Sequence, residues 1–188
     1  MALYTLPPHV SYVTPAPTSA ATPRVTAHEL RTACQGTPIP EAASYGGTVH
    51  PLVVVYRGDT AWILDNDTYD INAKWYGDEW HGPIQLVVCD GLTQEVEVDS
   101  CGTYARQSDG AVGEILRYRN FDVVRVVVAR TGKTLQSRTF YGDTPTCAAS
   151  MSGVENPDSN PPWRISGTDP DTGAINAYAV SVSTQKVK

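Results

Sequence analysis

The clearest pattern of apolar and polar positions covers residues 114–140, where two strand-like stretches flank a short polar turn. The first stretch is rich in valine, a β-branched residue that suits the pleated, half-buried surface of a strand. The turn Arg130-Thr-Gly-Lys133 supplies a glycine for the positive φ that a short hairpin connection needs. The pattern predicts a β-hairpin. Its expected core residues, with two from a neighbouring strand, are Val124, Val126, Val128, Leu86 and Val88.

Further strands are predicted on both sides of this hairpin. Residues 51–57 and 61–64 form a second hairpin around Gly58-Asp59. Residues 83–89 are apolar at successive positions, as in a buried strand. Residues 94–100 alternate, so we expect one face of that strand to be wet. The acidic face carries Glu95, Glu97 and Asp99, which could pair with Arg117, Arg119 and Arg125 on one side of the neighbouring strand.

The two ends of the chain have a different character. Residues 1–32 form a Pro/Thr/Ala-rich extended tail, in which Thr26 and Glu29 have the spacing of a helix capping box. Residues 33–149 are the expected core domain. Residues 150–188 read as a long loop followed by a C-terminal strand of the same domain, because residues 174–184 alternate. The predicted fold is all-β, a mostly antiparallel β-sandwich with an extended Pro-rich N-terminal tail.

Composition narrows the range of partners. Charged residues make up 18% of the 188 residues, and the net charge is −6. An acidic chain disfavours nucleic acid and anionic membrane surfaces, since both attract basic patches. The apolar runs are far shorter than the ~20 residues of a membrane span. The first residues show neither the basic nor the apolar region of a signal peptide.

Four cysteines point to an oxidising compartment. Cys34, Cys89, Cys101 and Cys147 form an even set whose spacing does not match a zinc site, so we expect two disulfides. Four cysteines allow three pairings. A turn at Asp90-Gly91 would put Cys89 and Cys101 out of reach of each other. A turn centred near Glu95 would pair them and leave Cys34 with Cys147. We favour the second arrangement.

One loop is the richest candidate for ligand contact. Aromatic faces stack on sugars and carboxylates accept hydroxyl protons, so this loop could bind carbohydrate; its aromatic residues could equally pin the loop to the sheet. The candidate contacts are Trp75, Tyr76, Asp78, Glu79, Trp80 and His81. A metal reading of the acidic residues and the histidine is weaker, because adjacent residues rarely converge on one ion. Residues 65–70 are acidic but lack the glycine and glutamate of a calcium loop. No catalytic, metal or cofactor motif is evident.

Several motifs along the chain resemble uncharacterised cysteine-containing β-domains of exported bacterial proteins, over about residues 33–147. The resemblance implies an extracytoplasmic, disulfide-bonded β-domain and carries no activity. The motifs are Cys34-x-Gly36, Pro38-x-Pro40-Glu-Ala-Ala43, His50-Pro-Leu-Val-Val54, Gln85-Leu-Val-Val-Cys89, Cys101, Arg117-Tyr-Arg119, Ala129-Arg-Thr-Gly-Lys-Thr134, Thr139-Phe140 and Pro145-x-Cys147.

These observations favour a non-enzymatic, extracellular or cell-surface structural protein over a secreted carbohydrate-binding module. We expect a homo-oligomer, either a ring or a filament, joined by tail or edge-strand exchange. Prolines would keep the tail extended and suit it to a sheet edge. The apolar residues that the tail offers for assembly are Tyr4, Leu6, Val10, Tyr12 and Val13.

Overall fold

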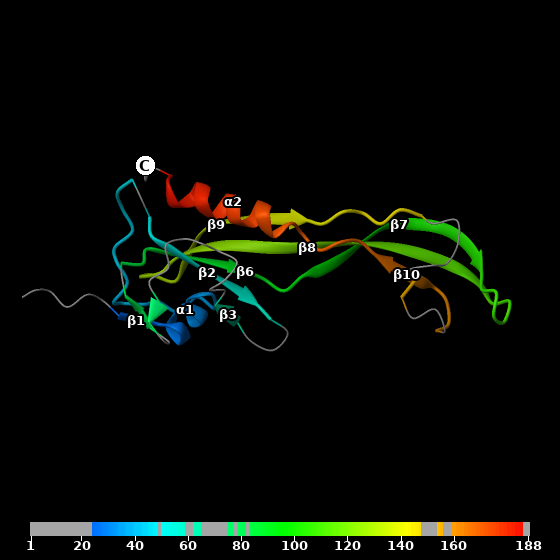
Figure 1. Ribbon diagram of the computed structural model, residues 1–188, viewed down its shortest axis with the longest axis horizontal. Helices are drawn as coiled ribbons and strands as arrows, with labels where there is room; N and C mark the ends of the chain where they lie inside the picture. Colours follow the sequence, from blue (N-terminus) through cyan, green and yellow to red (C-terminus); the bar gives the residue numbers. More distant parts are fainter. Residues whose placement is uncertain are drawn as a thin grey trace, which may run out of the picture.

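One strand, β8 (Val112–Val128), runs through most of the molecule and organises the rest (Figure 1). The computed structural model describes residues 24–48, 50–58, 62–64, 75–76, 79–81, 83–147, 154–155 and 159–185. At about 3.3 Å per residue, β8 is about 56 Å long. Its C-terminal half belongs to a body with helices on both faces, and its N-terminal half belongs to a narrow arm.

The main sheet has seven strands in the order β10-β8-β6-β2-β3, with β7 and β9 also paired to β8. Six of the eight strand pairings that the structure describes are antiparallel, which confirms the mostly antiparallel prediction. The pairs β2–β6 and β10–β8 are parallel. The other strands are β2 (Leu52–Arg57), β3 (Trp62–Leu64), β6 (Leu86–Asp90), β7 (Gln94–Ala105), β9 (Lys133–Tyr141) and β10 (Trp163–Ser166). Both predicted hairpins, β2–β3 and β8–β9, are confirmed.

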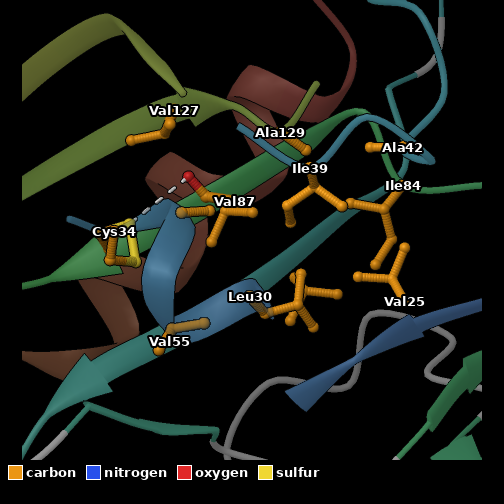
Figure 2. Close-up of a cluster of buried hydrophobic side chains, with 13 residues drawn as sticks. Val25, Leu30, Cys34, Ile39, Ala42, Val55, Ile84, Val87, Val127 and Ala129 are labelled. Atoms are coloured by element: carbon orange, nitrogen blue, oxygen red, sulfur yellow. Dashed lines mark hydrogen bonds between the residues drawn. A yellow bond between two sulfur atoms is a disulfide. The ribbon is translucent and has the colours of Figure 1, made fainter. Parts of the chain in front are cut away.

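Helix α1 (Ala27–Ala33) covers one face of the body. The side chain of Thr26 accepts from the Glu29 N–H, and the Glu29 carboxylate accepts from the Thr26 N–H, so the predicted capping box is present. Leu30 and Ala33 belong to one buried cluster with Val87 and Val127 of the sheet. Figure 2 labels Leu30, Val87 and Val127. Because Val25 and Leu30 are fully buried, residues 24–32 belong to the folded body, and the prediction that they are part of an extended tail is wrong.

Helix α2 (Thr172–Ser183) covers the other face, where a C-terminal strand was predicted; that prediction is wrong. Its buried residues are Ile175, Tyr178, Ala179 and Val182, which recur with helical spacing. Alternation among small residues such as Ala and Ser satisfies a strand pattern as well, so the pattern alone is ambiguous. Packing against the sheet selects the helix, because the helical conformation buries its apolar residues on the valine-rich face.

The five core residues predicted from the sequence lie together beneath α2. Leu86, Val88, Val124 and Val126 are buried, and the half-buried Val128 packs against them. Strands dominate the described residues, so the all-β class is confirmed in this coarse form. The sandwich is not confirmed, because helices cover both faces of the main sheet in the body. No described helix is long and apolar enough to cross a bilayer.

Both disulfides form, but with different partners from those predicted. Cys34 bonds Cys89, and Cys101 bonds Cys147. The predicted pairing required β6 and β7 to face each other across a turn. Instead β6 and β7 follow one another along the same edge of β8, so Cys89 lies opposite Arg125 while Cys101 lies beyond Asp99 in the arm. The sulfur atoms of Cys89 and Cys101 therefore lie too far apart to bond.

The arm also differs from its prediction, because β7 is wet on both faces. Val96 is 44% exposed and Val98 is 45% exposed. Of the predicted ion pairs, Arg117–Asp99 is present. Arg119 and Arg125 donate to backbone carbonyls instead.

Candidate functional site

The edge of β8 changes partner near Asn120. On one side of this point β9 pairs with β8 through Phe121–Tyr141, and the Gly142 N–H still donates to the Asn120 carbonyl. On the other side β10 takes the same edge, and the Gly167 N–H donates to the Tyr118 carbonyl. The segment that leaves β9 and the segment that leaves β10 therefore cross here and depart to opposite faces of the sheet.

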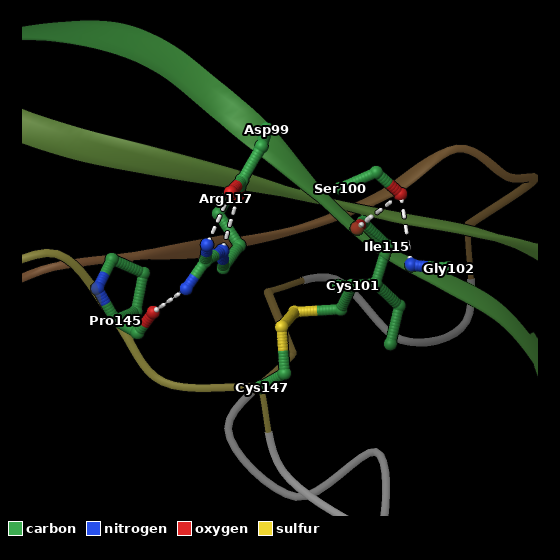
Figure 3. Close-up of polar contacts among 8 residues, drawn as sticks. All are labelled: Asp99, Ser100, Cys101, Gly102, Ile115, Arg117, Pro145 and Cys147. Atoms are coloured by element: carbon green, nitrogen blue, oxygen red, sulfur yellow. Dashed lines mark hydrogen bonds and ion pairs between the residues drawn. A yellow bond between two sulfur atoms is a disulfide. The ribbon is translucent and has the colours of Figure 1, made fainter.

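The departing segment 142–147 crosses the face that also carries α1. Arg117 donates from one nitrogen to the Pro145 carbonyl at 2.9 Å, while its other nitrogens bind Asp99 (Figure 3). The Cys101–Cys147 disulfide closes the same region, so this segment is fixed to the arm both covalently and by hydrogen bonds. The hydrogen bond from Arg117 lowers the pKa of the Asp99 carboxyl, which therefore stays ionised over the neutral range.

At the body end of the same face, another arginine ties down α1. Arg125 donates to the Cys34 carbonyl at 2.8 Å, directly beside the Cys34–Cys89 disulfide. Arg117 and Arg125, eight residues apart on β8, thus bind the two elements that cover this face, segment 142–147 and α1. Each attachment is reinforced by a disulfide.

Between these attachments no described element covers the sheet face, which carries aromatic and aliphatic residues with the polar residues Gln94 and Thr139 beside them. Phe121 and Tyr141 lie directly opposite each other, with ring centroids 5.8 Å apart. The Arg119 guanidinium lies 4.7 Å from the Tyr141 ring centroid and donates to the Gly142 carbonyl. Tyr141 is 52% exposed. We call this surface the aromatic window: Val96, Arg119, Phe121, Val123 and Tyr141.

The opposite face of β8, beneath α2, holds two acidic residues. Asp90 ends β6 and pairs with Val124 of β8. Asp122 lies two residues before Val124, on the same face of β8. Both side chains are buried. Burial, followed by the charge of Asp122, raises the pKa of Asp90 to about 7. Burial also raises the pKa of Asp122, opposed by a hydrogen bond from Thr93 and assisted by the charge of Asp169.

A shallow cleft of about 340 Å³ lies where the two departing segments cross. It is lined by Asp143, Thr144, Pro145, Thr146, Ser166, Gly167 and Thr168. Two of these polar groups are already engaged, because Thr168 accepts from the Asp143 N–H and Ser166 donates to Glu95. The cleft is therefore a consequence of the crossing.

The ligand-contact residues predicted from the sequence fall on a separate small sheet, in the order β1-β5-β4. Its strands are β1 (Arg24–Thr26), β4 (Trp75–Tyr76) and β5 (Glu79–His81). In its register Trp75 pairs with Trp80, Tyr76 pairs with Glu79, and Trp80 pairs with Val25. Five of the six predicted contact residues therefore lie on the two neighbouring strands β4 and β5.

Some predicted residues lie outside the described part of the chain. They are Asp78 and the five assembly residues Tyr4, Leu6, Val10, Tyr12 and Val13. Neither the aromatic window nor the Asp90–Asp122 pair was predicted from the sequence. The alternation of residues along β8 already places Arg119, Phe121 and Val123 on one face. Tyr141 joins them only because β9 pairs with β8, which the alternation does not show.

Comparison with known proteins adds no relative: no family model, curated protein or solved structure matches this chain. Among the described residues, no group of three or more histidine, cysteine or acidic side chains is arranged to hold a metal ion. Function is therefore inferred from the surfaces themselves.

Proposed function

We propose that this chain is a non-enzymatic, self-assembling interaction protein of an oxidising compartment. In this proposal the N-terminal segment, residues 1–23, of one copy docks on the aromatic window of another. The observation that carries the proposal is the window itself, in which exposed Tyr141 and half-buried Phe121 lie between two disulfide-fixed boundaries. Two disulfides are typical of proteins that work outside the reducing cytosol.

The size of the window indicates the kind of occupant. From Arg119 to Val123 it runs about 13 Å along the strands, and three strands span about 14 Å, which gives roughly 200 Å². A stable interface between two folded proteins buries about 800 Å² on each partner. The window is therefore too small for a globular partner by itself and fits an extended segment.

Residues 1–23 have the composition that such an occupant needs. They contain no Asp, Glu, Lys or Arg, so with His9 neutral docking near Arg119 buries no second side-chain charge. Five prolines restrict the backbone, which lowers the conformational entropy lost on docking. Tyr4, Leu6, Val10, Tyr12 and Val13 supply the apolar side chains that the window would cover.

The outer edge of β7 lies beside the window and adds backbone hydrogen-bonding groups. Val96 on β7 lies opposite Arg119, and no described residue pairs with the other edge of β7. An extended segment placed there could add as a strand, while its prolines are tolerated because an edge strand uses only half of its donors.

Docking between copies gives a head-to-tail contact. The segment leaves the body at β1, at the end of the molecule opposite the arm (Figure 1). A contact between two different surfaces closes into a ring or continues as a filament. This geometry supports the oligomer expected from the sequence.

The proposal is tested with a fluorescent peptide of residues 1–23 titrated into the chain that lacks them. We expect saturable binding with a dissociation constant on the order of 1–100 μM, because the buried area is small. Tyr141→Ser should abolish binding. Val180→Ser is the matched control, since Val180 is 54% exposed but lies on α2, and it should bind like the parent. Equal binding by both variants would refute the assignment of the window.

A further inference from the structure

Three buried oxygen acceptors lie together beneath the N-terminal end of α2. Asp90 and Asp122 are each 7% exposed, and Asn120 is 9% exposed. All three lie on the face of the sheet that carries Val124 and Val126. The Oδ1 atom of each accepts no hydrogen bond from any described residue. Buried acceptors without donors are costly, so this arrangement calls for an explanation.

The orientation of the Asn120 amide is fixed by its neighbours. Its Nδ2 donates to the Gly167 carbonyl and to the Asp169 carboxylate, at 3.2 and 2.9 Å. Its Oδ1 therefore remains an acceptor. Through these two bonds Asn120 holds the α2 lead-in, which we define as residues 167–171, against the sheet.

The charged and titratable groups around the pair do not neutralise it. Glu95 of β7 is already bound to Arg164 and Ser166. Arg138 of β9 lies over the rings of Phe140 and Tyr178, at 5.0 and 5.6 Å. Among the described residues no cation forms an ion pair with Asp90 or Asp122. Among the described residues, the titratable and charged groups on this face, from the elements around the pair, are Tyr45, Tyr56, Asp90, Glu95, Tyr118, Asp122, Arg138, Arg164, Asp169, Asp171 and Tyr178.

A proton is the simplest species that satisfies such a group. Bound to one carboxylate, it removes one of the like charges and converts one acceptor into a donor. The raised pKa of Asp90, to about 7 through burial and the charge of Asp122, agrees with this chemistry. The raised pKa of Asp122 has the same first cause.

We propose that Asp90 and Asp122 form a proton-binding site that couples the docking of the α2 lead-in to pH. With a proton bound, the lead-in stays attached through Asn120. When the pair loses that proton, Asp90, Asp122 and Asp169 carry like charges on the same side of the sheet. Their repulsion weakens the attachment at Asp169, while the hydrophobic contacts of Ile175, Tyr178 and Val182 hold the rest of α2.

The sign of the pH dependence follows from the direction of the shift. In the unfolded chain Asp90 ionises near its ordinary pKa of 3.8, whereas in the folded chain it ionises near 7. The stability that the bound proton gives to the folded state is therefore fully present below about pH 4. It is lost as the pH rises toward and through 7. The lead-in should be held most firmly in acid and released above neutral pH.

Hydrogen exchange of the full chain, read by mass spectrometry and corrected for intrinsic rates, tests the proposal. Between pH 5.5 and pH 8.5 we expect protection of amides 167–175 to fall three- to tenfold, while amides of β2 and β6 stay constant. Asp90→Asn should remove this pH dependence, and Asp122→Asn provides a second variant should the first not fold. Constant protection in the parent chain, or an unchanged pH response in both variants, would overturn the proposal.

A second arm of the same experiment separates a proton from a metal ion. The chain at pH 8.5 is measured with and without 1 mM CaCl₂. Protection that is unaffected by calcium supports a proton site. Protection that calcium restores to the level at pH 5.5 would show that the acidic group binds a cation, and would overturn the proposal.

Discussion

Gly142 and Gly167 lie where the segments that leave β9 and β10 pass so close to each other that neither position has room for a side chain. A Cβ atom on Gly142 would lie 1.7 Å from the Thr168 carbonyl oxygen, and one on Gly167 would lie 1.8 Å from the Asp143 carbonyl oxygen. In both cases the obstacle is backbone, which cannot rotate away. The two glycines therefore permit the crossing that sends one segment over the aromatic window's boundary and the other toward α2.

Gly142→Ala should destabilise the protein by roughly 2 kcal/mol or more, because the new methyl group must displace the crossing segment. Gly46→Ala is the control, since a Cβ atom there meets nothing within 4 Å and φ is not positive. Urea denaturation monitored by circular dichroism gives the comparison. Similar midpoints for the two variants would contradict the crossing.

The disulfide pairing predicts a specific peptide map. Proteolysis without reduction should release the linked pairs Cys34–Cys89 and Cys101–Cys147, which enclose 55 and 46 residues of sequence separation. Loops of this length are expected to contribute about 4 kcal/mol each by restricting the unfolded chain. Four cysteines that alkylate without a reductant would rule out both bonds.

Val126→Ala is expected to lower stability by about 1–3 kcal/mol, since its side chain is fully buried between β8 and α2. Val180→Ala, on the exposed side of α2, should change it by less than about 0.5 kcal/mol. The denaturation midpoints are compared at a constant m-value. An unchanged midpoint for Val126→Ala would place this valine outside the core.

Local patterns predicted the elements whose determinants are close in sequence. The β8–β9 hairpin follows from its valines and from Gly132, whose φ is +68°, and the start of α1 follows from Thr26 and Glu29. The core beneath α2 follows from Val124 and Val126. In each case a few neighbouring residues decide the conformation, so no knowledge of distant partners is required.

The remaining features depend on contacts between distant segments. Residues 174–184 fit two periodicities, and only the uncovered sheet face selects the helix. The cysteine pairing depended on whether β6 and β7 lie opposite each other or follow one another along β8. The residues around Glu95 alone could not show whether a turn lies there. The aromatic window joins Val96 to Tyr141 across β8, and the Asp90–Asp122 pair joins two strands in the same way.

If residues 1–23 join one copy of this chain to the next through the aromatic window, their deletion should separate the copies. Sedimentation velocity compares the full chain with residues 24–188 at equal concentration. We expect species larger than a monomer for the full chain, and a single monomeric boundary after the deletion. The same sedimentation distribution for both proteins would contradict it.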